Sequence, residues 1–236
     1  LIVVDGFPVS SDTPLREGQT VCLIRRGEMP PSEELEFLMM ARHTPGVHRK
    51  TKAAVVGIAG LGGLGSQVAI ALARAGLGTL ILADFDVVEP SNLNRQQYFI
   101  DQIGMPKTQA LRDTLARINP ATQVEIHQVV LTPDNIPVLF GRAQILVEAF
   151  DRPDQKAMLA NTWVSRFPGR PLVCASGLAG HEPANLIRTC RMGPIILVGD
   201  GAAEARQGQG LMAPRVGIAA HHQANAVLRL ILGEEP

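Results

Sequence analysis

The chain of 236 residues contains little cysteine and few aromatic residues. Its 3 cysteines are far apart and odd in number, so they cannot all pair within the chain. The sequence contains no pair of Cys-x-x-Cys elements, so we expect no zinc clip. This cysteine usage favours reduced thiols and a cytoplasmic protein.

The chain also lacks an excess of either charge. Its 22 basic residues balance 22 acidic ones, which gives a formal net charge of +0. The composition therefore gives no reason to expect nucleic acid or an acidic membrane as a partner. No apolar run reaches the ~20 residues that span a bilayer, and no basic segment precedes a cleavable apolar core. With 46% hydrophobic and 19% charged residues, the chain has the composition of an ordinary globular protein.

What the chain does contain is a glycine-rich loop between an apolar strand and an alanine-rich helix. Residues 55–65 are Val-Val-Gly-Ile-Ala-Gly-Leu-Gly-Gly-Leu-Gly. A strand that runs into such a loop and then into a helix brings backbone N–H groups and the positive helix end to one point, where a phosphate can bind. Asp84, after the next strand, is placed to hold a ribose. The pattern predicts a nucleotide site whose loop glycines are Gly60, Gly62, Gly63 and Gly65.

Short apolar strands and amphipathic helices alternate along most of the chain. Strands are predicted near 53–59, 80–83, 124–130, 145–148 and 172–175, and helices near 63–75, 106–118, 133–140 and 153–167. This alternation predicts an α/β, doubly wound, Rossmann-like fold with a mostly parallel sheet, whose ligands bind at the carboxyl ends of the strands. Two more strands are expected near 186–190 and 195–198, before a long apolar helix near 212–232.

The first residues have a different pattern. A strand at 1–4, a turn, a polar stretch and a second strand at 21–24 are expected. About two strands cannot bury themselves in water, so they must pack against the main domain or against other residues. A helix is expected from Ser32 toward Arg42. We therefore divide the chain into a small N-terminal β segment, 1–30, and a nucleotide-binding domain, 31–236.

A polar cluster follows Asp84 at the predicted mouth of the nucleotide pocket, and it includes Arg95 and Lys107. Beside a triphosphate, these cations would neutralise the charge that builds up during phosphoryl or nucleotidyl transfer. A redox cofactor mainly needs a dry pocket for its nicotinamide instead. Taken singly, each cation is better explained as a solvated side chain. Because both fall near the same predicted strand ends, the pair favours nucleotidyl chemistry.

Asp151 ends the apolar strand over 145–150. A carboxylate at the edge of a buried strand costs several kcal/mol in desolvation unless a cation or hydrogen bonds match it. A magnesium ion that bridges ATP oxygens would supply that match. The alternative is that Asp151 is the N-cap of the helix beginning near Pro153, and the two roles are compatible.

Several motifs in this order resemble the ThiF/MoeB/HesA family, the bacterial relatives of the ubiquitin-activating E1 enzymes. The motifs are 60–66, 84–86, 91–96 (Ser-Asn-Leu-Asn-Arg-Gln), Pro106-Lys107 and Asp151, and the likeness runs from about residue 42 to residue 232. The resemblance implies ATP-dependent adenylylation of the C-terminal glycine carboxylate of a small ubiquitin-like sulfur carrier, with release of pyrophosphate. It is nearest to ThiF-type members, whose carrier resembles ThiS and serves thiamine biosynthesis. A homodimer with shared sites is also implied.

The resemblance also implies a role for each residue of the motifs. Asp84 would hold the ribose hydroxyls, with Asp86 in the same cofactor site as a loop acid, and Asp151 would bind Mg²⁺. Arg42 lies where the family often donates an arginine into the partner subunit's ATP site, although its spacing from the glycine loop is short for the family. The residues implied around the phosphates are Asn92, Arg95, Gln96 and Lys107.

The chain departs from the family pattern in places. Cysteines of a metal clip are missing, and Arg152 stands where an asparagine often follows the magnesium aspartate. If a cysteine takes part in acyl or sulfur transfer, Cys190 is favoured over Cys174, which lies in an apolar strand. Residues 1–27 are similar to the second half of a ThiS-like β-grasp carrier, but without a Gly-Gly tail, which favours a docking or vestigial element.

Two other functions remain open from the residues. The glycine loop and Asp84 also permit a nicotinamide-dependent oxidoreductase. The carrier-like opening and Arg152 permit a non-catalytic subunit that binds a carrier without activating it. Binding of NADH without magnesium would indicate the first, and carrier binding without an acyl-adenylate would indicate the second.

Overall fold

The computed structural model describes all residues, 1–236. Its main sheet has seven strands in the order β6-β5-β4-β7-β8-β10-β9, and all neighbours are parallel except β10 and β9. The strands are β4 (Val55–Ala59), β5 (Thr79–Ala83), β6 (Gln123–His127), β7 (Ile145–Glu148), β8 (Leu172–Ala175), β9 (Arg188–Met192) and β10 (Ile195–Gly199). The predicted α/β, doubly wound and mostly parallel fold is confirmed.

Strand β4 lies where the chain changes direction across the sheet. From β4 the chain passes through α3 (Gly63–Arg74) to β5, and through α4 (Lys107–Ile118) to β6. It then returns to pair β7 with the other side of β4. In open α/β sheets the crevice at such a switch point, beyond the carboxyl ends of the strands, is where ligands bind.

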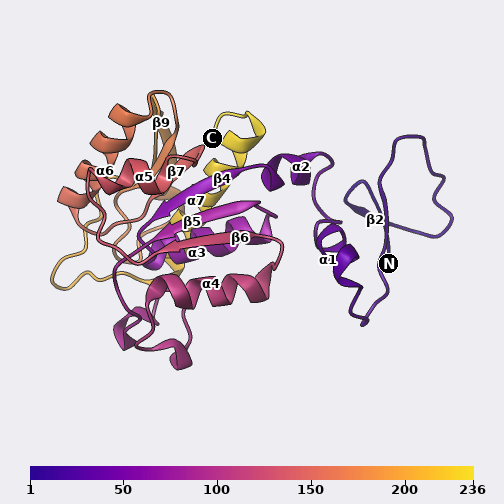
Figure 1. The fold of residues 1–236 in the computed structure, drawn as a ribbon, viewed down its shortest axis with the longest axis horizontal. Coiled ribbons are helices and arrows are strands. Elements are labelled where there is room, and N and C mark those ends of the chain that lie inside the picture. The colour runs from indigo at the N-terminus through magenta and orange to yellow at the C-terminus, as the bar shows by residue number, and fades with distance from the viewer.

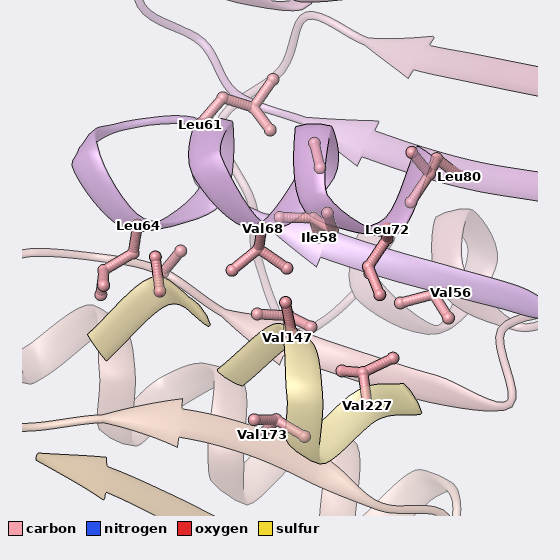
Figure 2. Packing of buried hydrophobic residues seen from close by; sticks show 14 of the residues in the cluster. Val56, Ile58, Leu61, Leu64, Val68, Leu72, Leu80, Val147, Val173 and Val227 are labelled. Carbon is pink, nitrogen blue, oxygen red and sulfur yellow. The ribbon is translucent and has the colours of Figure 1, made fainter. Parts of the chain in front are cut away.

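Helices cover both faces of the sheet (Figure 1). One core cluster lies among α3, α4, α7 (Ala213–Leu232) and the sheet, and Figure 2 shows Leu64, Val68 and Leu72 of α3 directed toward α7 and the strands. The second cluster lies under α5 (Asn135–Phe140) and α6 (Pro153–Arg166) and contains Phe140 and Trp163, both fully buried. Each such side chain contributes about 1.5–3 kcal/mol when removed from water, so the core fixes the strand ends firmly.

The N-terminal residues form a separate small lobe, to the right in Figure 1. It contains β1 (Ile2–Val4), β2 (Phe7–Val9), β3 (Val21–Leu23) and α1 (Ser32–Met39), and α2 (Val47–Lys52) leads from it to β4. The expectation of two strands was wrong, because β2 follows immediately after the turn. Asp5 and Gly6 have φ of 49° and 83° there, the left-handed pair of a tight hairpin that folds β2 back on β1.

Some predicted boundaries also differ. The strand expected over 124–130 ends at His127, and part of the strand expected over 186–190 is a short 3-10 helix, Ala184–Leu186, ahead of β9. Helix α2 has no counterpart among the predicted elements, because its sequence, Val-His-Arg-Lys-Thr-Lys, has no apolar periodicity. Helix α1 packs against the small sheet through Leu38, while the boundary at residue 30 stays a prediction. None of the helices combines the length and apolarity needed to cross a membrane.

Candidate functional site

The glycine loop connects β4 to α3 beside the end of β7. Gly60 has a left-handed φ of +88°, and a Cβ there would lie 2.9 Å from the carbonyl oxygen of Ala149, just after β7. At Gly65 a Cβ would lie 1.9 Å from the carbonyl oxygen of Gly60. Only glycine allows both approaches. No side chain caps α3, so the N–H groups of its first turn are left for water or a ligand.

Asp84 holds the glycine loop at the end of β5. Its Oδ2 accepts a hydrogen bond of 2.6 Å from the Leu61 N–H, and its Oδ1 accepts one of 2.8 Å from the Asp86 N–H. Burial raises the pKa of the Asp84 carboxyl, against the opposing effect of these two N–H groups and of Lys107. A carboxylate has about four acceptor positions, so Asp84 keeps positions free for hydroxyl groups of a ligand.

Lys107 lies next to Asp84 at the first residue of α4. Its side chain is only 7% exposed, and its Nζ lies 2.9 Å from Oδ2 of Asp86. A cation at a helix N-terminus opposes the helix dipole, and the Asp86 carboxylate offsets that cost. The site therefore holds a buried cation beside the glycine loop, although Asp86 itself is half exposed.

The segment 91–98 lies across the first turn of α3. A Cβ at Gly63 would lie 3.4 Å from Cγ of Arg95, so the arginine stem covers this turn. Gln96 is buried and faces Gly62, and its Oε1 has no hydrogen-bond partner. Asn92 is also buried, but its Oδ1 accepts from the Glu89 N–H at 3.0 Å and shapes the turn. A buried amide oxygen without a partner is uncommon, which singles out Gln96 among the side chains around the glycine loop.

Asp151 lies in the turn between β7 and α6. Its side chain is exposed, and no hydrogen bond or ion pair involves its carboxylate. The N-cap alternative was wrong, since the capping position of α6 is Arg152 and no side chain caps the helix. The expected desolvation was wrong too, because β7 ends three residues earlier, at Glu148. Asp151 is thus a free carboxylate at the carboxyl edge of the sheet.

Glu148 is the acid that the strand buries. It is 1% exposed, and both of its oxygens bind Nζ of Lys156, at 2.9 and 3.1 Å. Its Oε1 also accepts from the Phe150 N–H at 2.7 Å. Burial raises the pKa of Glu148, with Lys156 opposing. This pair was not predicted, although a glutamate at the end of an apolar strand was a signal for it.

A second buried ion pair, also missed, joins the later loops to the start of α7. Arg215 is 3% exposed, binds the Asp200 carboxylate and donates to the carbonyl oxygen of Glu182 at 2.7 Å. A Cβ at Gly63 would lie 3.0 Å from Cγ1 of Val216, the next residue. The loops at 177–186 and 199–211 are therefore fixed next to the glycine loop.

The structure does not bring every predicted residue to this site. Arg42 donates from Nε to the carbonyl oxygen of Gly6 at 3.0 Å, in the small lobe at the opposite end of β4, and its role in a partner subunit stays a prediction. Cys174 is buried on β8, and burial raises its pKa to about 12. Cys190 is exposed on β9, with three strands between it and β4.

Comparison with known proteins matches residues 38–236 to the model of the ThiF family. The ubiquitin-like modifier-activating enzyme 5 of Caenorhabditis briggsae is 48% identical over 88 residues, 37% of this chain and 20% of that protein. The adenylyltransferase and sulfurtransferase UBA4 of Candida glabrata is 28% identical over 204 residues, 83% of this chain and 47% of that protein. This chain spans less than half the length of either relative.

Among solved structures, the Escherichia coli tRNA N6-threonylcarbamoyladenosine dehydratase TcdA in complex with ATP has the same fold. It superposes with a TM-score of 0.75 at 22% identity, over 83% of this chain and 92% of that chain. At this identity, the likeness shows the fold alone.

Proposed function

Since this chain belongs to the ThiF family, we propose that it binds ATP at the glycine loop and adenylylates the terminal carboxylate of a small ubiquitin-like protein. The observation that carries the proposal is the hydrogen bond of 2.6 Å from Leu61 N–H to Asp84. It joins an acceptor for ribose hydroxyls to an uncapped helix start suited to phosphates. The buried Lys107 lies beside both.

In this proposal the side chains position ATP and neutralise charge. Asp84 accepts from the ribose hydroxyls, while Arg95 and Lys107 stabilise the negative charge that grows on the phosphates. The carboxylate of the incoming protein attacks the α-phosphorus in line, so a new P–O bond forms as the bond to pyrophosphate breaks. No general base is needed, because a carboxylate is already ionised at neutral pH.

Asp151 fits a magnesium site because its carboxylate is exposed and unpaired. No group of three His, Cys, Asp or Glu side chains comes together to hold a metal ion. Mg²⁺ commonly binds proteins through one or two carboxylates and takes its other ligands from phosphates and water. When bound, it would neutralise negative charge on the phosphates.

The finer proposal is a ThiS-like sulfur carrier as substrate and a homodimer in which Arg42 enters the partner's site. ThiF-family membership and the sulfurtransferase named among the relatives support a carrier of this class.

The test is to incubate the protein with ATP, Mg²⁺ and a ThiS-like carrier ending in Gly-Gly, and to look for the mass of the adenylate on the carrier. We expect the adenylate with the natural chain and a loss of about a hundredfold or more in its rate of formation with Arg95→Ala. Arg112→Ala is the matched control, because it removes an equal charge from the surface of α4 and should keep the rate.

Absence of adenylate despite carrier binding would instead indicate a non-catalytic subunit. A change in NADH fluorescence without magnesium would indicate an oxidoreductase. Equal rates for Arg95→Ala and Arg112→Ala would remove Arg95 from the mechanism.

A further inference from the structure

Ser66 bridges the glycine loop and the segment that carries Arg95. Its hydroxyl donates to the carbonyl oxygen of Gly62 at 2.7 Å and accepts from the Gln97 N–H at 3.1 Å. The residue has no exposed surface. One buried hydroxyl therefore links the start of α3 to a segment 31 residues further along the chain.

Gln67, the next residue of α3, makes a second link. Its Nε2 donates to the carbonyl oxygen of Arg95 at 3.2 Å. Helix α7 closes over it, since a Cβ at Gly217 would lie 3.0 Å from Oε1 of Gln67. Packing thus holds the side chain of Gln67 in this position.

These links hold the backbone on both sides of Gln96. The guanidinium of Arg95 bonds only within its own segment, to Ser91 O at 3.2 Å and Asn94 Oδ1 at 2.9 Å. Those bonds do not fix Arg95 relative to α3. The links that do so come from the side chains of Ser66 and Gln67, and from Tyr98, whose hydroxyl donates to Leu61 O at 2.7 Å.

We propose that Ser66 and Gln67 are positioning residues, which hold Arg95 and Gln96 where they meet the phosphates of ATP. The inference rests on the proposed function, in which the phosphates lie at the first turn of α3. A site built to stabilise phosphate charge is effective when its donors are held in place before the ligand arrives. Ser66 and Gln67 hold this segment without contacting the ligand.

The experiment measures the affinity of the whole chain for Mg-ATP and for adenosine by calorimetry. We expect Gln67→Met and Ser66→Ala to lower the preference for ATP over adenosine by about tenfold each, the usual effect of one hydrogen bond. Adenosine affinity should stay unchanged, which also shows that the variants are folded.

Gln102→Met is the matched control. Gln102 is another buried glutamine. Its Oε1 accepts from the Phe99 N–H at 3.0 Å, and its Nε2 donates to the carbonyl oxygen of Ala110 in α4, also at 3.0 Å. Its loss should lower the melting temperature at least as much as Gln67→Met, because it breaks more hydrogen bonds, while the preference for ATP stays as in the natural chain.

A double-mutant cycle separates positioning from general stability. In an Arg95→Ala background, Gln67→Met should lower the ATP preference by less than in the natural chain, because only Gln96 is then left to be positioned. A full additional tenfold loss there, or an unchanged ATP preference in both Gln67→Met and Ser66→Ala, would overturn the inference. If the natural chain itself shows no preference for ATP over adenosine, the proposed function is wrong. That result differs from failure of the positioning inference, in which the natural chain prefers ATP and the variants keep this preference.

Discussion

The two sides of the crevice at the end of β4 are built differently. On the side of α3 and β5, the polar groups are bonded to backbone: Asp84 to Leu61 N–H, and Ser66 to Gly62 O. On the side of β7 and α6, Asp151 is exposed and unpaired. In the proposed function, the first side is the organised half, which would hold the nucleotide, and the second is the open half, which would take the metal ion and the incoming carboxylate.

The open half nevertheless has a rigid base. Behind Asp151, the buried Glu148 binds Lys156, and Nζ of Lys156 also donates to Ala175 O at 3.0 Å. The pair joins the ends of β7 and β8 to α6. The turn that presents Asp151 is therefore anchored at its base, even though the carboxylate itself is free.

The largest effect is expected from Gly65→Ala, on the organised side of the crevice. The new methyl would overlap the carbonyl oxygen of Gly60 at 1.9 Å, and the loop would have to move. We expect a loss of about 3 kcal/mol in the free energy of unfolding and loss of ATP binding, measured by denaturant titration and calorimetry. Gly210→Ala is the control, because nothing lies within 4 Å of a Cβ there, and it should stay within about 0.5 kcal/mol of the natural chain.

An intermediate effect is expected from Asp84→Asn, as a function of pH. Burial raises the pKa of Asp84 in the folded state, so between its ordinary value and the raised value the folded chain holds more protons than the unfolded chain. The stability of the natural chain relative to the variant should therefore fall as pH rises through that interval, and level off above it. Denaturant titrations across pH test this, and a difference that grows with rising pH would contradict it.

The smallest structural effect is expected from Asp151→Asn. Because the carboxylate is exposed and unpaired, the free energy of unfolding should change by less than about 0.5 kcal/mol, while the Mg²⁺ dependence of ATP binding is lost. Glu148→Gln is the contrast and should cost about 1–3 kcal/mol, because Lys156 loses its charged partner. Equal costs for the two variants would remove the distinction between the free acid of the open half and its anchored base.

Much of the architecture was predictable, because its signals are local. Short apolar runs alternating with amphipathic segments predicted the parallel strands, and the glycine spacing predicted the loop between β4 and α3. The acid expected at the end of β7 shows where local signals stop being sufficient. Glu148 and Asp151 are three residues apart, and which of them is buried depends on where β7 stops pairing with its neighbours.

Strand β2 was missed for a related reason. It has only three residues, one of them Pro8, and it exists because a tight turn at Asp5-Gly6 returns it to β1. Strands β1 and β3 are equally short and were expected, but β2 contains a proline, which argues against a strand in a sequence pattern.

By itself, the sequence determined that a nucleotide-type site was to be expected. The signals are local, because the loop glycines are close together in the chain and the acid directly follows the next strand. Only the tertiary structure decided which side chains support that site. Ser66 and Gln67 meet partners 31 and 28 residues away, and such pairings arise from how α3 packs under the segment that follows β5, which no local pattern encodes.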